Sequence, residues 1–236
     1  MSGGFAIRPV ARYHGDFPDK FGIPRQAGVV PELEGLVVFE PEFREREALR
    51  GIEGFERLWL IWQFSENLRE GFSPTVRPPR LGGNVRMGVF ATRSPFRPNG
   101  LGLSCVELVA LKEREGLGTV LVVRGADLMD GTPIFDVKPY VPYADAWPAA
   151  RAGFAPDAGE TLAVDCPSAL LEQLPEAKRA ALLGVLARDP RPRYQKDPKR
   201  EYAMSFAGLE VRFTVDAAAL YVTEIRPTPQ KKREET

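Results

Sequence analysis

Apolar residues along the chain fall in short runs that turn-forming residues separate. The run at 58–64, LWLIWQF, is dense in large apolar side chains and predicts a buried strand. Further strands are predicted over short β-branched or aromatic segments at 5–12, 36–39, 86–91, 103–111, 119–123 and 134–139. Many short strands without long helices between them favour a β-barrel or a sandwich over a parallel α/β sheet. We therefore expect a mainly β N-terminal half.

Two segments of this half depart from the strand pattern. Residues 42–50 form a charged run that predicts a helix, ended by Gly51. Residues 71–84 contain three prolines and three glycines and predict a long loop, which carries Arg77 and Arg80.

The hydrophobic pattern changes after about Trp147. Residues 149–159 are rich in Ala, Pro and Gly, and this composition predicts a linker. We therefore expect two domains, the first over residues 1–148 and the second over residues 160–236.

The second domain mixes both periodicities. Apolar residues alternate with polar ones over 162–166 and 209–215, which predicts strands. Residues 168–188 are rich in Leu and Ala and predict a helix that Pro175 splits. A small α+β domain follows from these elements.

The composition is that of an ordinary globular protein, with 44% hydrophobic and 27% charged residues. The apolar runs are far shorter than the roughly 18 residues that a transmembrane helix needs. The N-terminus lacks the charged start and apolar region of a secretory signal. Cys105 and Cys166 have no zinc-ligand spacing and suit a reducing compartment. We expect a soluble cytoplasmic protein without a disulfide framework.

The net charge is zero, because 32 Lys and Arg residues balance 32 Asp and Glu residues. Nucleic-acid-binding domains are usually basic overall. Any contact with RNA must therefore come from local basic patches.

Two segments, FGIPRQAG at 21–28 and GVFATRSPFRPNGLGLS at 88–104, carry candidate binding residues. Prolines in the second segment reduce the entropy lost when the loop that holds Arg93 and Arg97 is ordered. The planar arginine side chain suits carboxylates and phosphates. The loop is thus either an anion or RNA site or a surface loop with solvated arginines.

A third segment, at 125–148, groups the acidic residues Asp127, Asp130, Asp136 and Asp145. These residues could bind a metal, or accept hydrogen bonds from a ribose or an amino group; alternatively, they cap turns. No histidine accompanies them, so a transition-metal site is disfavoured and we expect no metal.

A fourth segment, RDPRPRYQKDPKREY at 188–202, interleaves basic and aromatic residues. This pattern is typical of a nucleic-acid surface, although a solvated linker to the last strands has the same composition. The chain has no strand–GxGxxG–helix motif, no P-loop and no GxSxG motif. Rossmann-type enzymes are therefore disfavoured.

The segments FGIPRQAG, GVFATRSPFRPNGLGLS, DGTPIFDVKPYVPYADA and DPRPRYQ resemble, in this order, the signatures of the TsaA-like family. That family includes the tRNA threonylcarbamoyladenosine methyltransferases. The resemblance implies a single N-terminal β-barrel that binds S-adenosylmethionine near the interface of a homodimer. It also implies methylation of the exocyclic N6 nitrogen of threonylcarbamoyladenosine next to the anticodon of tRNA. The DPRPRYQ segment implies the bacterial form, with an added C-terminal domain.

Carried over residue by residue, the resemblance implies cofactor contacts from Pro24, Arg25, Gln26, Ser65, Arg93, Leu103, Asp130, Gly131, Thr132 and Pro133. Ser65 stands where many relatives have histidine. No residue identifies itself as a general base, and Asp130 and Asp136 are the candidates. The residues predicted to contact RNA are Arg97, Arg191, Arg193, Lys196 and Lys199.

Two rival interpretations remain. One, from a different class, is a barrel that binds RNA or a metabolite without catalysis, and the other is an enzyme that methylates a different small acceptor. Titration with S-adenosylmethionine distinguishes the first rival, because a pure RNA-binding module has no reason to bind that molecule.

Overall fold

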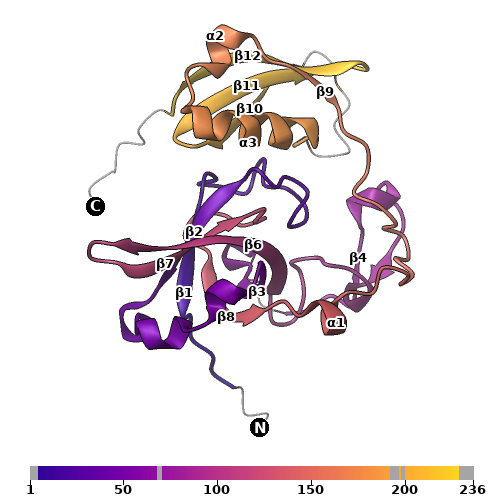
Figure 1. The fold of residues 1–236 in the computed structure, drawn as a ribbon. Helices are drawn as coiled ribbons and strands as arrows, with labels where there is room; N and C mark the ends of the chain where they lie inside the picture. Colours follow the sequence, from indigo (N-terminus) through magenta and orange to yellow (C-terminus); the bar gives the residue numbers. More distant parts are fainter. Residues whose placement is uncertain (1–4, 68–70, 192–196, 198–199, 229–236) are drawn as a thin grey trace, which may run out of the picture.

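Six strands of the N-terminal half close into a barrel in the computed structural model, which describes residues 5–67, 71–191, 197 and 200–228 (Figure 1). Around the barrel the order is β1-β2-β7-β6-β3-β8, and β8 pairs back onto β1. The strands are β1 (Ala11–His14), β2 (Glu34–Phe39), β3 (Arg57–Gln63), β6 (Leu101–Arg114), β7 (Gly118–Arg124) and β8 (Pro133–Pro139). All of these pairings are antiparallel, and the expectation of a mainly β fold is confirmed.

The interior of the barrel is filled by the apolar residues of alternating strand positions. Leu58, Leu60 and Trp62 of β3 are buried, while the residues between them are more exposed. They share one hydrophobic cluster with residues such as Val106 and Ile134. The period of two along a strand places these side chains on one face, as the sequence predicted.

Three local predictions in this half are wrong. The strand predicted at 5–12 begins only at residue 11, as β1 (Ala11–His14). Residues 42–50 form only the short 3-10 turns η1 (Pro41–Phe43) and η2 (Arg46–Leu49), followed by η3 (Ile52–Gly54). Leu49 is the only buried residue of these turns, so little packing offsets the cost of nucleating an α-helix. Gly51 takes a left-handed φ of 85°, which ends the run.

The predicted strand at 86–91 is reduced to β5 (Met87–Gly88), which pairs only with β4 (Thr75–Val76). The next residues form the 3-10 turn η6 (Val89–Ala91). Two further 3-10 turns belong to this region, η4 (Ser65–Asn67) and η5 (Pro79–Leu81).

The second unit is a four-stranded sheet of order β10-β11-β12-β9, with α3 against one face (Figure 1). The short helix α1 (Pro142–Asp145) precedes it. The elements of the second unit are β9 (Ala163–Asp165), α2 (Ser168–Leu171), α3 (Glu176–Ala187), β10 (Tyr202–Phe206), β11 (Leu209–Val215) and β12 (Ala219–Pro227). The predicted break at Pro175 is confirmed, since α3 begins at the next residue. Strands β10 and β12 were not predicted from the sequence.

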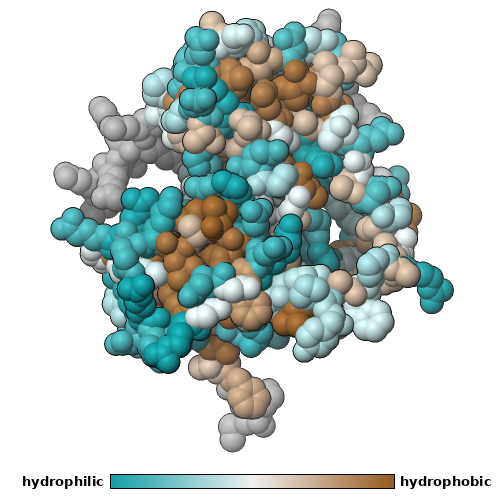
Figure 2. All heavy atoms as spheres, viewed as in Figure 1, coloured by the Kyte–Doolittle hydropathy of each residue, from teal (hydrophilic) through white to brown (hydrophobic). Residues whose placement is uncertain are grey.

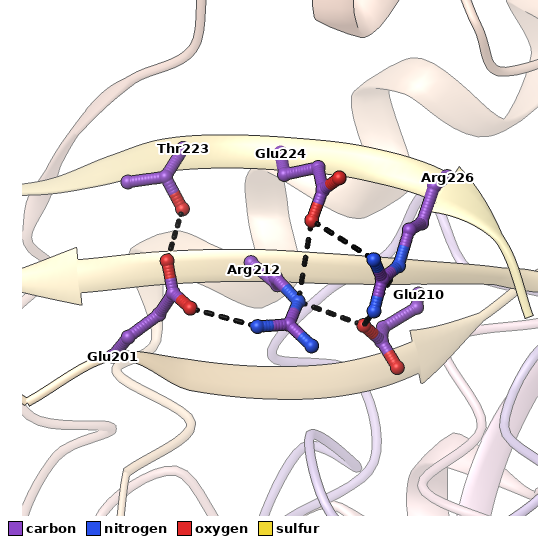
Figure 3. Close-up of polar contacts among 6 residues, drawn as sticks. All are labelled: Glu201, Glu210, Arg212, Thr223, Glu224 and Arg226. Atoms are coloured by element: carbon purple, nitrogen blue, oxygen red, sulfur yellow. Dashed lines mark hydrogen bonds and ion pairs between the residues drawn. The ribbon is translucent and has the colours of Figure 1, made fainter.

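The other face of this sheet carries a network of charged side chains (Figure 3). Arg212 contacts Glu201 at 2.9 Å and Glu210 at 2.8 Å, and Arg226 contacts Glu210 at 2.7 Å. Glu224 lies opposite Arg212 in the register of β11 and β12. Cross-strand pairs of opposite charge suit the solvated face of a sheet whose opposite face is buried.

The connection between β1 and β2 joins the two units. Phe17, Val30 and Leu33 from this connection are buried in the hydrophobic cluster of the second unit. A Cβ on Gly184 of α3 would lie 2.8 Å from Val30 Cγ1, so the helix packs closely on the connection. The segment FGIPRQAG belongs to this connection and is therefore held from both sides.

Hydrophobic residues also reach the surface. The face shown in Figure 2 has a hydrophobic patch over the barrel, surrounded by hydrophilic residues. In the part of the chain that the structure describes, no helix has the length and apolar character needed to cross a membrane.

Candidate functional site

A wide cleft lies between the mouth of the barrel, the loop that contains β4 and β5, and the second unit. In Figure 1 the chain after α1 runs beside β4 on its way to the second unit. The cleft is lined by residues within 20–29, 61–66, 71–86, 90–97, 101–103, 127–132, 152–162 and 185–190. Stretches far apart in the sequence thus contribute to one concave surface, where a ligand site is expected.

The first two sequence motifs meet in this cleft. The guanidinium of Arg93 donates a hydrogen bond to Oε1 of Gln26, across 67 positions of the chain. Gln26 Nε2 donates to the carbonyl of Arg25. Pro24 and Leu103 line the same cleft, and 56% of Leu103 is exposed. The predicted cofactor residues of both motifs therefore lie on one surface.

A chain of three side chains connects the barrel interior to the cleft. Trp62 Nε1 donates to Ser104 Oγ at 2.9 Å, and Ser104 Oγ donates to Asp127 Oδ1 at 2.5 Å. The ring of Trp62 lies so close to Gly102 that a Cβ there would be 2.3 Å from the indole. Trp62, Gly102 and Asp127 all line the cleft.

The electrostatics of Asp127 differ from those of a surface aspartate. Burial raises the pKa of its carboxyl above the ordinary value. The Ser104 hydroxyl, the charge of Arg93 and the backbone N–H of Ala27 act in the opposite direction and favour the ionised form. In the sequence, Asp127 is one of four neighbouring aspartates. No local pattern distinguished it from the other three.

The other aspartates of that group lie outside the cleft lining. Asp130 Oδ1 is 3.1 Å from Nδ1 of His14, and Asp136 Oδ2 is 2.9 Å from Lys138 Nζ. Asp145 accepts a hydrogen bond from Trp59 Nε1 at 3.0 Å. The two candidates for a general base, Asp130 and Asp136, are thus engaged elsewhere.

The predicted DGTP turn contributes unequally to the cleft. Thr132 lines it, whereas Gly131 and Pro133 do not. Thr132 is 3% exposed, and its hydroxyl donates to the carbonyl of Met129 at 2.7 Å. Ser65, expected as a further cofactor contact, lies in the lining on η4.

Arginines are concentrated on the rim of the cleft. Arg77, Arg86 and Arg97 all line it. Among the described residues, neither Arg77 nor Arg86 forms an ion pair with a carboxylate. Arg80 is bound to Asp157 of the linker by a 2.5 Å contact, and this contact ties the linker to the loop. Such a rim suits anionic ligands.

The predicted RNA-contacting segment at 188–202 is only partly described. Arg191 is paired with Asp189 at 2.8 Å, and 13% of its side chain is exposed. Its carbonyl accepts a hydrogen bond from Arg25, which brings this segment to the first motif. Arg193, Lys196 and Lys199 lie outside the described residues.

Two family models match nearly the whole chain. The model described as the tRNA-methyltransferase O N-terminal domain matches residues 12–146, and the TrmO C-terminal domain model matches residues 159–228. This chain belongs to the tRNA-methyltransferase O family. The predicted family is thereby confirmed.

Three relatives are similar to this chain over almost their full length. The tRNA (adenine(37)-N6)-methyltransferase of Escherichia coli strain K12 is 37% identical over 232 residues, which cover 94% of this chain and 98% of that protein. A Pseudomonas aeruginosa relative named as an S-adenosylmethionine-dependent methyltransferase is 39% identical, covering 88% and 91%. The crystal structure of TrmO from Pseudomonas aeruginosa matches with a TM-score of 0.79 and 31% identity, covering 95% and 99%. The predicted enzyme class and cofactor agree with these names.

Within the described part of this TrmO family member, no group of three or more His, Cys, Asp or Glu side chains is arranged to hold a metal ion.

Proposed function

We propose that this protein transfers the methyl group of S-adenosylmethionine to the N6 nitrogen of adenine 37 in tRNA, with threonylcarbamoyladenosine as the acceptor. One observation carries the proposal. The cleft gathers Gln26, Arg93 and Leu103 from two distant motifs onto a single surface, next to a rim of arginines. Family membership and the names of the relatives support the reaction class.

The residues of the cleft fit the cofactor. S-adenosylmethionine has a carboxylate, which the guanidinium groups of Arg25 or Arg93 can bind. Its adenine ring can pack on an apolar side chain such as Leu103. Ser65 can donate and accept a hydrogen bond. When bound, the cofactor supplies an electrophilic methyl group, and the protein supplies its orientation.

The proposed acceptor accounts for the arginines that line the cleft. Threonylcarbamoyladenosine has a carboxylate of its own, for which Arg97 at the rim is a suitable partner. Its N6 nitrogen is part of a urea-like group and is a poor nucleophile, so holding it at near-attack distance supplies much of the rate. The nucleotide must leave the stack of the anticodon loop to enter the cleft.

We propose that both units contact the tRNA. The cleft is lined by the barrel and by the second unit, which contributes Arg188 and Pro190 at the start of the basic segment. Arg77 and Arg86 line the same cleft and can bind phosphates. The residues Arg191, Arg193, Lys196 and Lys199 of the basic segment belong to this proposal, as does a cytoplasmic location, where tRNA is found.

A homodimer is also part of the proposal. Phe72 and Phe90 stack with ring centroids 6.1 Å apart beside the cleft, and 72% of Phe90 is exposed. Exposed aromatic rings at the edge of a site suit a second subunit. Light scattering of the purified protein tests this, and a monomer that retains activity would contradict it.

The function is tested by mass spectrometry of tRNA nucleosides. A deletion strain should lose the methylated form of threonylcarbamoyladenosine, and the purified protein with S-adenosylmethionine should restore it. tRNA that lacks the threonylcarbamoyl group should remain unmethylated. Methylation of both tRNAs at equal rates would leave the methyltransferase activity intact but contradict the specificity.

A further inference from the structure

We infer that the carboxylate of Asp127 accepts the proton that leaves the N6 nitrogen during methyl transfer. The inference rests on the proposed function and adds the identity of the general base. It follows from the position of this side chain at the point where the barrel interior opens into the cleft.

Asp127 is held in place by groups from three parts of the chain. Ser104 of β6 donates to its Oδ1 at 2.5 Å, and Ser104 is itself oriented by Trp62 of β3. The backbone N–H of Ala27, in the FGIPRQAG segment, lowers the pKa of the carboxyl and so favours the carboxylate form. These donors leave the side chain partly exposed to the cleft rather than covered. A rigid, accessible carboxylate meets the first requirement for a general base, which is geometry.

The groups around Asp127 shift the pKa of its carboxyl in opposite directions. Burial raises the pKa of the carboxyl, which makes the carboxylate a stronger base than one in water. The hydroxyl of Ser104 and the charge of Arg93 act against this rise in pKa, because both stabilise the ionised form. A base whose pKa moves toward the working pH is favoured in proton transfer.

The transfer balances in atoms and electrons. The lone pair of N6 forms the new bond to the methyl carbon while the bond from that carbon to sulfur breaks. The electron pair of the broken bond stays on sulfur, and S-adenosylhomocysteine leaves as a neutral thioether. The proton of N6 passes to Asp127, which becomes a carboxylic acid and later releases the proton to solvent.

The neighbouring aspartates are poorer acceptors in this structure. Asp130 is engaged by His14 and by the backbone N–H of Gly15, and it lies outside the cleft lining. Asp136 is paired with Lys138. Among the described residues, the other acidic side chains that line the cleft are either paired or exposed. Asp157 and Asp189 are paired with Arg80 and Arg191. Glu66 and Glu160 are exposed.

Replacement of Asp127 by asparagine removes the base and keeps an oxygen that can accept from Ser104. With saturating S-adenosylmethionine and tRNA that carries threonylcarbamoyladenosine, D127N should lower kcat by about 10²-fold or more. Calorimetry should show unchanged binding of S-adenosylmethionine. Glu53→Gln, which removes an exposed carboxylate from the 3-10 turn η3, is the matched control and should leave kcat unchanged.

A second measurement does not depend on turnover. The carboxyl carbon of Asp127, assigned by its absence in D127N, is titrated by ¹³C NMR in the free protein. The pKa of Asp127 should lie above that of an ordinary aspartate. Ser104→Ala should raise this pKa further, because a hydrogen-bond donor to the charged form is lost. In the profile of kcat against pH, the acid limb should move to higher pH in S104A. In D127N this limb should disappear.

The outcomes separate the two proposals. A wild-type protein that methylates no tRNA overturns the proposed function. An active wild-type protein with an equally active D127N overturns only the role of Asp127. Loss of S-adenosylmethionine binding in D127N would also overturn it, because the residue would then hold the cofactor. An Asp127 that titrates as an ordinary aspartate contradicts the inference as well.

Discussion

Lys178 of α3 holds the second unit to the barrel through an ion pair that is buried on its Asp16 side. Its Nζ lies 2.7 Å from Asp16 Oδ2 and 3.3 Å from the carbonyl of Glu34. Only 9% of the Asp16 side chain is exposed, against 27% of Lys178. Burial raises the pKa of Asp16, and Lys178 counteracts this shift. Lys178→Met keeps the length of the side chain but leaves the carboxylate buried without its cation.

The expected loss is about 3–5 kcal/mol, the usual cost of removing one partner from a buried pair. For a chain of this size that corresponds to a fall in Tm of roughly 6–20 °C. Urea unfolding followed by far-ultraviolet circular dichroism measures the loss. Lys112→Met, at an exposed position of β6, is the control and should change stability by no more than about 0.5 kcal/mol.

The loss in K178M should depend on pH. Without Lys178 the folded-state pKa of Asp16 rises further above the unfolded value of about 3.9, so the folded protein binds the proton more tightly. The variant is therefore most destabilised above the folded-state pKa. The difference in unfolding free energy between K178M and wild type should become smaller as the pH falls toward the pKa of Asp16 in the unfolded chain.

The double variant Asp16→Asn with Lys178→Met should recover most of the stability, because no charge remains buried. A loss below about 1 kcal/mol in K178M would refute the argument, since a buried unpaired charge costs more than that. The argument would also be refuted if K178M lost as much unfolding free energy at acidic pH as at neutral pH.

Three further predictions concern the cleft. Gly102→Ala should destabilise the protein by about 1–3 kcal/mol, because a Cβ would lie 2.3 Å from the indole of Trp62; urea unfolding measures the loss, and tryptophan fluorescence should change with it. Arg93→Ala should lower kcat/KM for tRNA methylation by about 10–100-fold in steady-state assays, and unchanged kinetics would remove this arginine from the site. Reversal of Arg77 and Arg86 to Glu should weaken tRNA binding and flatten its log–log salt dependence by about 0.7–0.9 per lost phosphate contact; an unchanged slope in filter binding would place the phosphates elsewhere.

Several elements could be predicted from sequence because their signal is local. The density of large apolar residues predicted β3, and the alternation over 209–215 predicted β11, since a strand with one buried face repeats every two residues. Pro175 marked the start of α3, because proline lacks the N–H that a helix interior needs and suits a helix start. The turn-rich motifs also indicated loops that line the cleft.

Local signals failed where packing outweighed them. The charged run at 42–50 had helical composition, yet only Leu49 is buried there, and the segment forms short 3-10 turns instead. Residues 86–91 had strand composition, but only Met87–Gly88 found a partner strand. The connection that holds Phe17 was interpreted as part of the first domain, and its apolar residues pack in the second core.

The sequence by itself determined the strands with clear alternation, the broken helix and the motifs that resemble a family, because each depends on neighbouring residues. Only the tertiary structure decided which aspartate lies in the cleft. Asp127 is distinguished from Asp130 by its contact with Ser104, which lies 23 positions away. In the same way Gln26 meets Arg93 only because the barrel closes and the β1–β2 connection folds over its mouth. Contacts between distant residues depend on strand pairing and loop closure, and these leave no pattern in the local sequence.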